Sequence, residues 1–549
     1  MWWKLTRVCR RWRHLVHNSA SYLGLRILCT NGTPTVDTLD HLPALPLFID
    51  YQDGPATMGA PDESGMSHAL QQRDRIHHIQ LYTLPSSLRK SFEHMGKSFP
   101  ILEHLSLSSR AEDDAYLVLP MTFLATNLRH LTLVGVSLTK ELPLLASTVS
   151  LVTLTITKIQ VSGYFLPSRL VTRLQNFPQL EELSISFSIP IPRPSAEREL
   201  FVALETPVTL SALKRLTFHG ISAYLESLVA QIVAPHLEQL RIILFNQVAF
   251  TSPHLFNFAS AAGRLRFPYA TVTFYQNAAS IVMDNPLWQE QGGDMPKSFS
   301  IQVLCRQFDW QIDSVAQICR ALGPLLSAVD LLHLIYDGWR TLVEWKDGAV
   351  DGATWHELLR PFVTVRKLHI SHALVDELSR ALQVDDVGLD PELLPGLMEL
   401  APELEADNAF VSFIVTRQSV DRPVRLSPMR IGWRCSLCQK VFSRRQDRDR
   451  HELAHLPPFL HCPVPDCTWR GNRADSFRKH WHQKDHQEQY GHTPERSQIE
   501  TFNPKAILDQ VRSGAISFTE GQDQALLLVQ VKARELAKPD MWTNPWGQR

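Results

Sequence analysis

The chain has 549 residues, of which 44% are apolar and 20% are charged, and its formal net charge is −1. A chain of this length is expected to form more than one domain. The near-neutral charge argues against nucleic-acid binding along the whole chain, so any such binding must be local. No run of about 18 apolar residues is present, and we therefore expect no membrane span.

The first residues of the chain show the periodicity of an amphipathic helix. Its apolar positions, spaced i, i+3, i+4, i+7 and i+11, are Leu5, Val8, Cys9, Trp12 and Val16. Its basic positions are Lys4, Arg7, Arg10, Arg11 and Arg13. We interpret this segment as a helix that packs its apolar stripe on the core and exposes a basic face to solvent. Binding to nucleic acid or to a membrane surface is the alternative.

The same stretch resembles part of a known motif. Residues 8–15 read Val-Cys-Arg-Arg-Trp-Arg-His-Leu, which is similar to the second half of an F-box, and the continuation to Pro46 resembles the F-box-like proteins of mushroom-forming fungi. The family's opening Leu-Pro helix is absent here. The resemblance implies docking on the adaptor subunit of a cullin-RING ubiquitin ligase, with a protein substrate as second partner. We assign 1–50 to a partial, helical F-box-like segment, and the polar, Gly/Pro/Ser-rich residues 51–75 to a loop.

An apolar-x-x-apolar-x-apolar unit recurs in the middle of the chain. The nine units start at Ile76, Leu102, Leu128, Leu151, Leu180, Leu213, Leu237, Val329 and Val365. Most neighbouring starts among the first seven lie 23–29 residues apart, which is the period of leucine-rich repeats. Helical patterns between the units indicate one strand and one helix per repeat, which are stable only when stacked.

This pattern predicts an α/β fold class. We expect a degenerate leucine-rich-repeat solenoid over 76–415, with parallel strands at the repeat positions, in preference to an ordinary α/β sheet. The inward-pointing side chains are expected to include Leu131, Leu154, Leu183 and Leu216.

Two sets of cysteine and histidine follow a linker that we place at 416–432. The first set is Cys435-x2-Cys438-x12-His451-x3-His455, and the second is Cys462-x4-Cys467-x12-His480-x5-His486. Two cysteines on a turn and two histidines on one helix face supply four tetrahedral ligands, and this spacing is typical of zinc sites. We assign 433–488 to two ββα zinc fingers of the C2H2 type that bind two Zn²⁺ ions, and 489–549 to a helical tail. His482 cannot share a helix face with His480, so His486 is the preferred ligand.

The small apolar cores of these fingers depart from the usual pattern. Phe442 stands at its usual position, but Arg448 replaces the core leucine of the first finger. In the second finger Phe477 takes the leucine position, and Gly471 stands where an aromatic residue is usual, so Trp469 is expected to fill that space. Because so little apolar surface is available, metal binding must supply the folding free energy, on the order of 10–16 kcal/mol.

The fingers are also the basic part of the chain, since 433–486 carries 11 Lys and Arg against 6 Asp and Glu. In such fingers three helix positions reach bases. These positions correspond to Arg444, Asp447 and Arg450 in the first finger and to Arg473, Ser476 and Lys479 in the second. Arginine is the preferred partner of guanine. The connection 456–461 lacks the Thr-Gly-Glu-Lys-Pro joint of tandem DNA-binding fingers, so protein binding or a purely structural role is an alternative.

The sequence contains none of the common catalytic motifs for phosphate, dinucleotide, acyl or metalloprotease chemistry. Both zinc sites would have four protein ligands and no open coordination position. We therefore expect a protein of the nucleus or cytoplasm that is not an enzyme, with no catalytic residues, membrane partner or small-molecule substrate. Two functions remain: a transcription-regulator type that binds DNA or RNA and uses its repeats for protein interaction, and a substrate receptor of a ubiquitin ligase.

Overall fold

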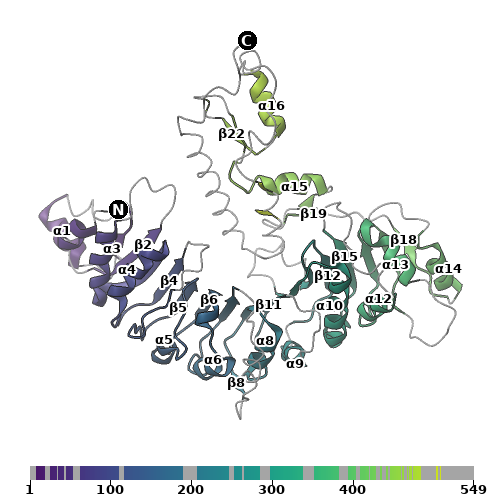
Figure 1. Ribbon diagram of the computed structural model, residues 1–549, viewed down its shortest axis with the longest axis horizontal. Coiled ribbons are helices and arrows are strands. Elements are labelled where there is room, and N and C mark those ends of the chain that lie inside the picture. The colour runs from purple at the N-terminus through teal and green to yellow at the C-terminus, as the bar shows by residue number, and fades with distance from the viewer. Residues whose placement is uncertain are drawn as a thin grey trace. The chain divides into compact units, whose positions relative to one another are not determined.

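The computed structural model divides the chain into two compact units, Met1–Ser427 and Pro428–Arg549. Figure 1 shows both. The described residues are 8–18, 25–31, 33, 35–41, 45–52, 62–109, 117–188, 207–245, 253–262, 265–284, 297–337, 352–382, 393–402, 409–419, 421–427, 433–435, 441–442, 445–458, 460–462, 467, 469–472, 474–483, 503–504 and 507–508. None of the helices in these ranges is long and apolar enough to cross a membrane.

One sheet runs through the first unit, in the order β1-β2-β3-β4-β5-β6-β7-β9-β11-β14-β13-β12-β15-β16-β17-β18. The strands are β1 Ile27–Cys29, β2 Leu47–Gln52, β3 Ile76–Thr83, β4 His104–Ser109, β5 His130–Val134, β6 Thr153–Ile159, β7 Glu182–Phe187, β9 Arg215–Gly220, β11 Gln239–Phe245, β12 Tyr269–Phe274, β13 Ala279–Asp284, β14 Ser298–Leu304, β15 Leu331–Tyr336, β16 Lys367–Ile370, β17 Glu399–Pro402 and β18 Arg425–Leu426. Neighbouring strands are parallel, except that β13 is antiparallel to β12 and to β14. A separate pair is formed by β8 Val208–Thr209 and β10 Ile232–Val233.

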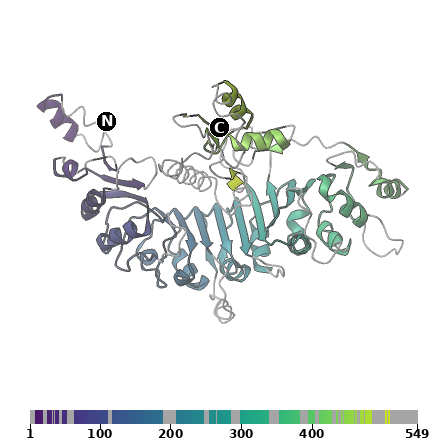
Figure 2. The same cartoon turned by 45° about the horizontal axis from the view of Figure 1, so that its top comes forward.

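The helices that connect the strands lie along one face of this sheet (Figures 1 and 2). The helices of the first unit are α1 Arg10–Asn18, α2 Thr35–His41, α3 Glu63–Gln71, α4 Pro85–Met95, α5 Pro143–Ser147, α6 Pro167–Leu174, α8 Ser222–Val229, α9 Pro253–Ala261, α10 Phe308–Ala321, α11 Gly323–Leu326, α12 Gly352–Leu359, α13 Val375–Ala381 and α14 Val411–Ser419. Several begin at a proline, such as Pro85, Pro143 and Pro167, because the first helical position needs no N–H donor. Several neighbouring helices pack on one another, such as α2 on α3, α3 on α4 and α12 on α13.

The nine sequence units each contribute a strand, which confirms the predicted parallel sheet. Leu131, Leu154, Leu183 and Leu216 occupy one register row across β5, β6, β7 and β9. All four side chains are buried. Since each strand places its leucines at the same height as the next, the apolar layer is continuous across the sheet. The architecture is therefore mixed α/β with a long, mainly parallel sheet, and it is compatible with stacked repeats.

The sheet extends further in both directions than the sequence predicted. The segment 1–50, expected to be helical, contains β1 and most of β2, whose Leu47, Ile49 and Tyr51 alternate into the core. The expected loop 51–75 contains α3, which begins after Asp62, whose side chain accepts a hydrogen bond from Gly65 N. The expected linker 416–432 contains β18, which pairs with β17. These boundaries were wrong because short alternating strands and one capped helix carry no leucine-repeat signature.

The prediction that the N-terminal helix packs on the core was wrong for the described residues. Val8, Trp12 and Leu15 are 64%, 48% and 53% exposed, and Cys9 is exposed as well. The described apolar core begins only at Leu25, so α1 lies outside that core. Leu5 and Val16 fall outside the residues whose side chains are described.

A three-strand insertion interrupts the repeats where the sequence showed a gap. β14 returns to pair with β11, β12 pairs with β15, and β13 lies between β12 and β14 in the opposite direction. β12 alternates apolar and polar residues in Tyr-Ala-Thr-Val-Thr-Phe, and so it escaped a search for leucine units.

The second unit contains two ββα modules in the order expected. The first module has β19 Trp433–Arg434, β20 Val441–Phe442 and α15 Arg445–Leu453, and the second has β21 Leu460–His461, β22 Arg470–Gly471 and α16 Ala474–Gln483. The strands of each module form an antiparallel pair. Most of the predicted tail 489–549 lies outside the described residues.

Replacing Leu183 with Ala is expected to lower the free energy of unfolding by about 2–5 kcal/mol, because the buried side chain would leave a cavity. Urea denaturation followed by circular dichroism measures the change. The matched control is Leu28→Ala, since Leu28 is 51% exposed on β1, and its effect is expected to stay within about 0.5 kcal/mol. Equal losses at the two positions would contradict the repeat packing.

Candidate metal centres

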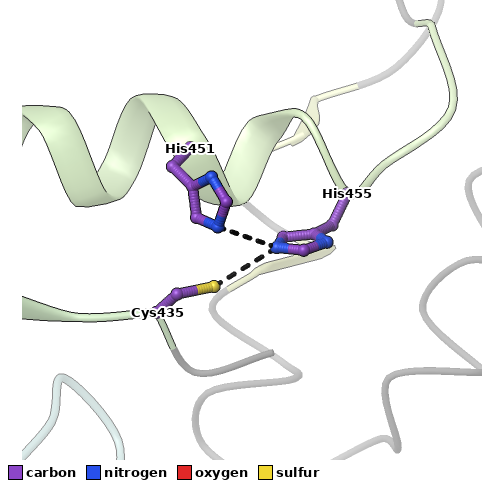
Figure 3. A group of neighbouring side chains, drawn as sticks. All are labelled: Cys435, His451 and His455. Carbon is purple, nitrogen blue, oxygen red and sulfur yellow. Dashed lines mark hydrogen bonds between the residues drawn. The ribbon is translucent and has the colours of Figure 1, made fainter. Parts of the chain in front are cut away.

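Three predicted ligands converge in the first ββα module. Cys435 directly follows β19, while His451 lies in the last turn of α15 and His455 just beyond it. His455 Nε2 lies 3.1 Å from His451 Nε2 and 3.4 Å from Cys435 Sγ (Figure 3). All three donor atoms lie within 4.8 Å of one another. One hairpin and one helix therefore direct a sulfur and two imidazole nitrogens at one point.

These distances lie close to the edges of a metal tetrahedron, the nitrogen–nitrogen distance being slightly shorter. With metal–sulfur bonds of about 2.3 Å and metal–nitrogen bonds of about 2.0–2.1 Å, neighbouring ligand atoms lie about 3.3–3.6 Å apart. Thiolate and imidazole are also the donor types that suit zinc and related ions. Without a cation between them, two facing Nε2 atoms would bring their lone pairs together unless one nitrogen carried a proton. The donor set thus fits a tetrahedral metal ion.

The second module repeats this arrangement. Cys462 follows β21, Cys467 lies between the two strands, and His480 projects from α16. The Sγ atom of Cys467 lies 3.3 Å from Nε2 of His480, and the three donor atoms again lie within 4.8 Å of one another. Cys462 and His480 are buried, so water has restricted access to this group.

Six of the eight predicted ligands are thus brought together in two groups, three in each. The remaining two, Cys438 and His486, lie outside the described residues. His482 is exposed and does not join the second group, in agreement with the helix-face argument against it.

The core of the second module is built around Trp469. Its ring lies 5.4 Å from the ring of Phe477 and is stacked on His480 at 5.0 Å. A Cβ atom at Gly471 would meet Trp469 Cη2 and Cζ2 at 2.9 Å. The indole therefore occupies the space that a side chain at 471 would need, which confirms that Trp469 fills the position of the missing aromatic residue.

The first module buries charge where the second buries aromatic rings. Arg448, at the position of the usual leucine, is 7% exposed and pairs with Asp449 at 2.7 Å. Glu452 on the same helix is also buried. Even a paired buried charge loses its hydration, so it contributes less to folding than an apolar side chain of similar volume. Among the described side chains, the interior of the first module is therefore more polar than that of the second.

The two modules are joined by direct contacts. Asn472 Nδ2, at the end of β22, donates to Leu453 O and Leu456 O, both at 2.9 Å. An apolar cluster includes residues of the connection, of the second module and of the following tail; its members are Leu456, Leu460, Cys462, Phe477, Trp481, Ile507 and Leu508. The chain between the modules is therefore packed and hydrogen-bonded, and it does not act as a free linker.

Four of the six predicted base-reading residues lie within the described residues, and all four are on the two helices. Asp447 and Arg450 on α15 form an ion pair at 3.5 Å. Ser476 is half-buried on α16, and Lys479 is exposed. Arg444 and Arg473 lie outside the described residues.

In the first unit, the sheet face opposite the helices carries in-register polar and aromatic side chains. Phe48, His78, His104 and His130 form one row across β2 to β5, and their rings follow one another at 5.6, 5.3 and 4.2 Å. Burial lowers the pKa of His104, and the neighbouring His130 lowers it further. Burial also lowers the pKa of His130, so the uncharged forms of these two imidazoles are favoured, which allows their rings to stack without repulsion.

A shallow hollow adjoins this row at the ends where the strands begin. Its lining residues are His77, Ile101, Glu103, Asn127, Arg129, Ser150 and Gln179. The sequence places His77, His78, His104 and His130 on repeat strands, where such residues are usually at the surface or satisfied in the core, and it gave them no function. The recurrence of His at 78, 104 and 130, at the repeat spacing of 26 residues, is the signal that could have revealed this face.

Replacing Gly471 with Ala is expected to push Trp469 off Phe477 and to cost about 1–3 kcal/mol, because the added methyl group overlaps the indole. Metal binding and folding are coupled in such modules, so the cost should appear as weaker Zn²⁺ binding in a chelator competition with the full chain. Gly323→Ala is the matched control, since no heavy atom lies within 4 Å of its added Cβ. Unchanged affinity in Gly471→Ala would disprove the proposed role of Trp469.

Comparison with known proteins gives no family assignment. No protein-family model matches the chain, and no curated protein matches its sequence. Among solved structures, the chain is similar to the leucine-rich repeat-containing protein LegL7 from Legionella pneumophila, with 11% sequence identity and a TM-score of 0.22. That alignment covers 73% of this chain and 99% of LegL7. A score this low does not establish a common fold, so the repeat arrangement rests on the strand register alone.

Proposed function

We propose that this chain is a zinc-binding protein without enzymatic activity. Its two ββα modules act as C2H2-type zinc fingers that bind nucleic acid, and its sheet unit is a degenerate leucine-rich-repeat array that binds protein. The observation that carries the proposal is the convergence of Cys435, His451 and His455 in one module and of Cys462, Cys467 and His480 in the other. A transcription-regulator role in the nucleus follows from this combination.

Each module would hold one Zn²⁺ ion through two thiolates and two imidazoles. Cys435, Cys438, His451 and His455 would bind the first ion, and Cys462, Cys467, His480 and His486 the second. Bound zinc supplies folding free energy in modules of this size. With all four positions taken by protein ligands, the ion has no coordination site for a substrate, which favours a structural role over catalysis.

Local positive charge supports binding to nucleic acid. The modules are the basic part of a chain whose overall charge is near zero, and Arg450 and Lys479 are exposed on their helices. Phosphate contacts provide most of the affinity for a duplex, while base contacts provide sequence preference. Two modules that read about 6 base pairs would bind weakly alone.

The open face of the sheet supports protein binding by the first unit. A mainly parallel sheet usually has both faces covered, whereas here the row from Phe48 to His130 is half-exposed. Because the same geometry repeats from strand to strand, the face is a broad, regular surface that could contact a partner segment through several repeats at once.

A ubiquitin-ligase substrate receptor is the second candidate. The exposed Val8, Trp12 and Leu15 favour it, because they offer an apolar surface within the residues that resemble an F-box. In this case the sheet unit would hold the substrate. A pulldown of the full chain that tests for the cullin adaptor separates this candidate from the first.

The full-length chain is expected to contain two zinc ions, because two sets of donor atoms converge. Elemental analysis should show one ion after Cys435→Ser or Cys462→Ser, and close to none after both changes. Cys9→Ser serves as control, since Cys9 is exposed in the first unit, and should keep two. Metal-free wild-type protein, or a metal content unchanged in the double variant, would refute zinc binding.

A labelled GC-rich DNA duplex is expected to bind the zinc-loaded chain at low salt, with affinity that falls as salt rises. Arg444→Ala combined with Arg473→Ala should lower the preference for GC-rich over AT-rich duplex, because arginine at these positions reads guanine. Absence of binding by the wild-type chain at low ionic strength would shift the function to protein interaction alone.

A further inference from the structure

We propose that the open face of the sheet binds an extended segment of a partner protein, with an acidic side chain of that segment on Arg241. The partner's carboxylate would pair with this guanidinium, and its main chain would lie along a row of hydroxyl groups on the neighbouring strands. This inference rests on the proposed protein binding by the first unit, and it names the chemistry by which the partner is recognised.

The row that contains Arg241 crosses the middle of the open face. Leu240 and Ile242 of β11 are buried in the core, so Arg241 between them lies on the opposite face of the sheet. Its register neighbours are Thr217 of β9 and Ser300 of β14. Beyond Thr217 the row continues over four more strands with Ser184, Thr155, Thr132 and Ser106. Five consecutive strands therefore place a hydroxyl group in line with one arginine.

Arg241 has no counter-ion among the described residues. Its side chain is exposed, and within those residues it forms neither a hydrogen bond nor an ion pair. By contrast, Arg215 in the neighbouring row of the same face pairs with Glu182 at 2.7 Å. Although the side chain of Arg241 reaches solvent, the surrounding protein removes part of its hydration, which lowers the pKa of Arg241, while Tyr275 raises it. A partly desolvated cation without a carboxylate beside it is unfavourable, and an anionic ligand would offset that cost.

The histidine beside Arg241 adds no second charge. His219 of β9 lies diagonal to Arg241, since its register partner is Ile243, two residues further along β11. Burial, followed by the charge of Arg241, lowers the pKa of His219 to about 4. Its Nδ1 atom lies 3.2 Å from Ser186 Oγ, which orients the ring. His219 is therefore neutral at physiological pH, and of this pair Arg241 alone carries a positive charge.

The composition of the row favours a peptide over a nucleic acid as the ligand. A nucleic-acid backbone carries a charge on every phosphate and is bound by several cations, whereas the row from Ser106 to Arg241 contains one cation. Hydroxyl groups both donate and accept hydrogen bonds, and the amides of a peptide main chain do the same. Within the described residues, none of the five hydroxyl groups of this row makes a hydrogen bond. They are therefore available to main-chain groups of a partner.

The position of Arg241 at one end of the hydroxyl row predicts where the acidic residue lies in the partner segment. Adjacent strands lie about 4.8 Å apart, so the distance from Ser106 to Arg241 across the sheet is about 24 Å. An extended peptide advances about 3.3–3.4 Å per residue, so about seven residues would cover the row. The acidic residue is therefore expected near one end of a segment of this length.

A random-peptide phage library selected on the zinc-loaded full chain tests the inference. The enriched peptides should share an Asp or Glu, and exchanging that residue for Asn or Gln should weaken binding about 10- to 100-fold. Arg241→Gln should cause the same loss, and the two changes together should cost little more than either alone. Thr217→Val, which removes a hydroxyl group but no charge, should weaken binding several-fold.

Arg89→Gln is the matched control, because Arg89 is exposed on α4, on the face of the sheet that carries the helices, and it should leave peptide binding unchanged. Both arginines are exposed, so folding should be retained, which urea denaturation of each variant verifies. The inference is overturned, while protein binding by the chain stands, if the enriched peptides share no acidic residue or if Arg241→Gln binds them like the wild type. A loss of DNA-duplex binding in Arg241→Gln as large as the loss of peptide binding would also overturn it. If the wild-type chain enriches no peptide, the proposed protein binding itself fails.

Discussion

The second unit depends on one constraint, the convergence of sulfur and imidazole donors at the end of a short helix. A hairpin of two-residue strands and a helix of nine or ten residues bury too little apolar surface to fold alone. In the first module the interior even contains Arg448 and Glu452. A cation held by the donor atoms would offset both deficits at once, and it would fix the direction in which each helix presents its surface.

A different constraint organises the first unit. There the register between neighbouring parallel strands repeats, so that equivalent residues of successive units form continuous rows. The inward rows hold leucine and isoleucine and merge into one core, while the outward rows hold groups such as the imidazoles of His104 and His130. A single repeat could not bury its apolar face. The same regularity that stabilises the sheet therefore also generates an extended polar surface.

How far the sequence predicts this molecule depends on whether a feature is local. Leu183 and its equivalents were predicted because the alternation of a strand and the repeat period can be recognised from the sequence pattern alone. The spacing from Cys435 to His455 was recognised for the same reason, since it reflects one turn and one helix. The crossing of β12 to β14 depends on pairing between distant strands, and the contact of Asn472 with the end of α15 depends on how two modules pack. Contacts of this kind, between residues far apart in the sequence, leave no pattern within any one short segment. The cap of α3 by Asp62 was local and could have been recognised.

X-ray absorption at the zinc edge of the full-length chain tests the central claim most directly, because it reports the ligand atoms around the ion. The account predicts an average of two sulfur neighbours at about 2.3 Å and two nitrogen neighbours at about 2.0–2.1 Å per zinc. It also predicts that Cys467→Ser lowers the average sulfur count, since Cys467 Sγ lies beside His480 Nε2. A shell of oxygen and nitrogen without sulfur, or one unchanged by that substitution, would contradict it.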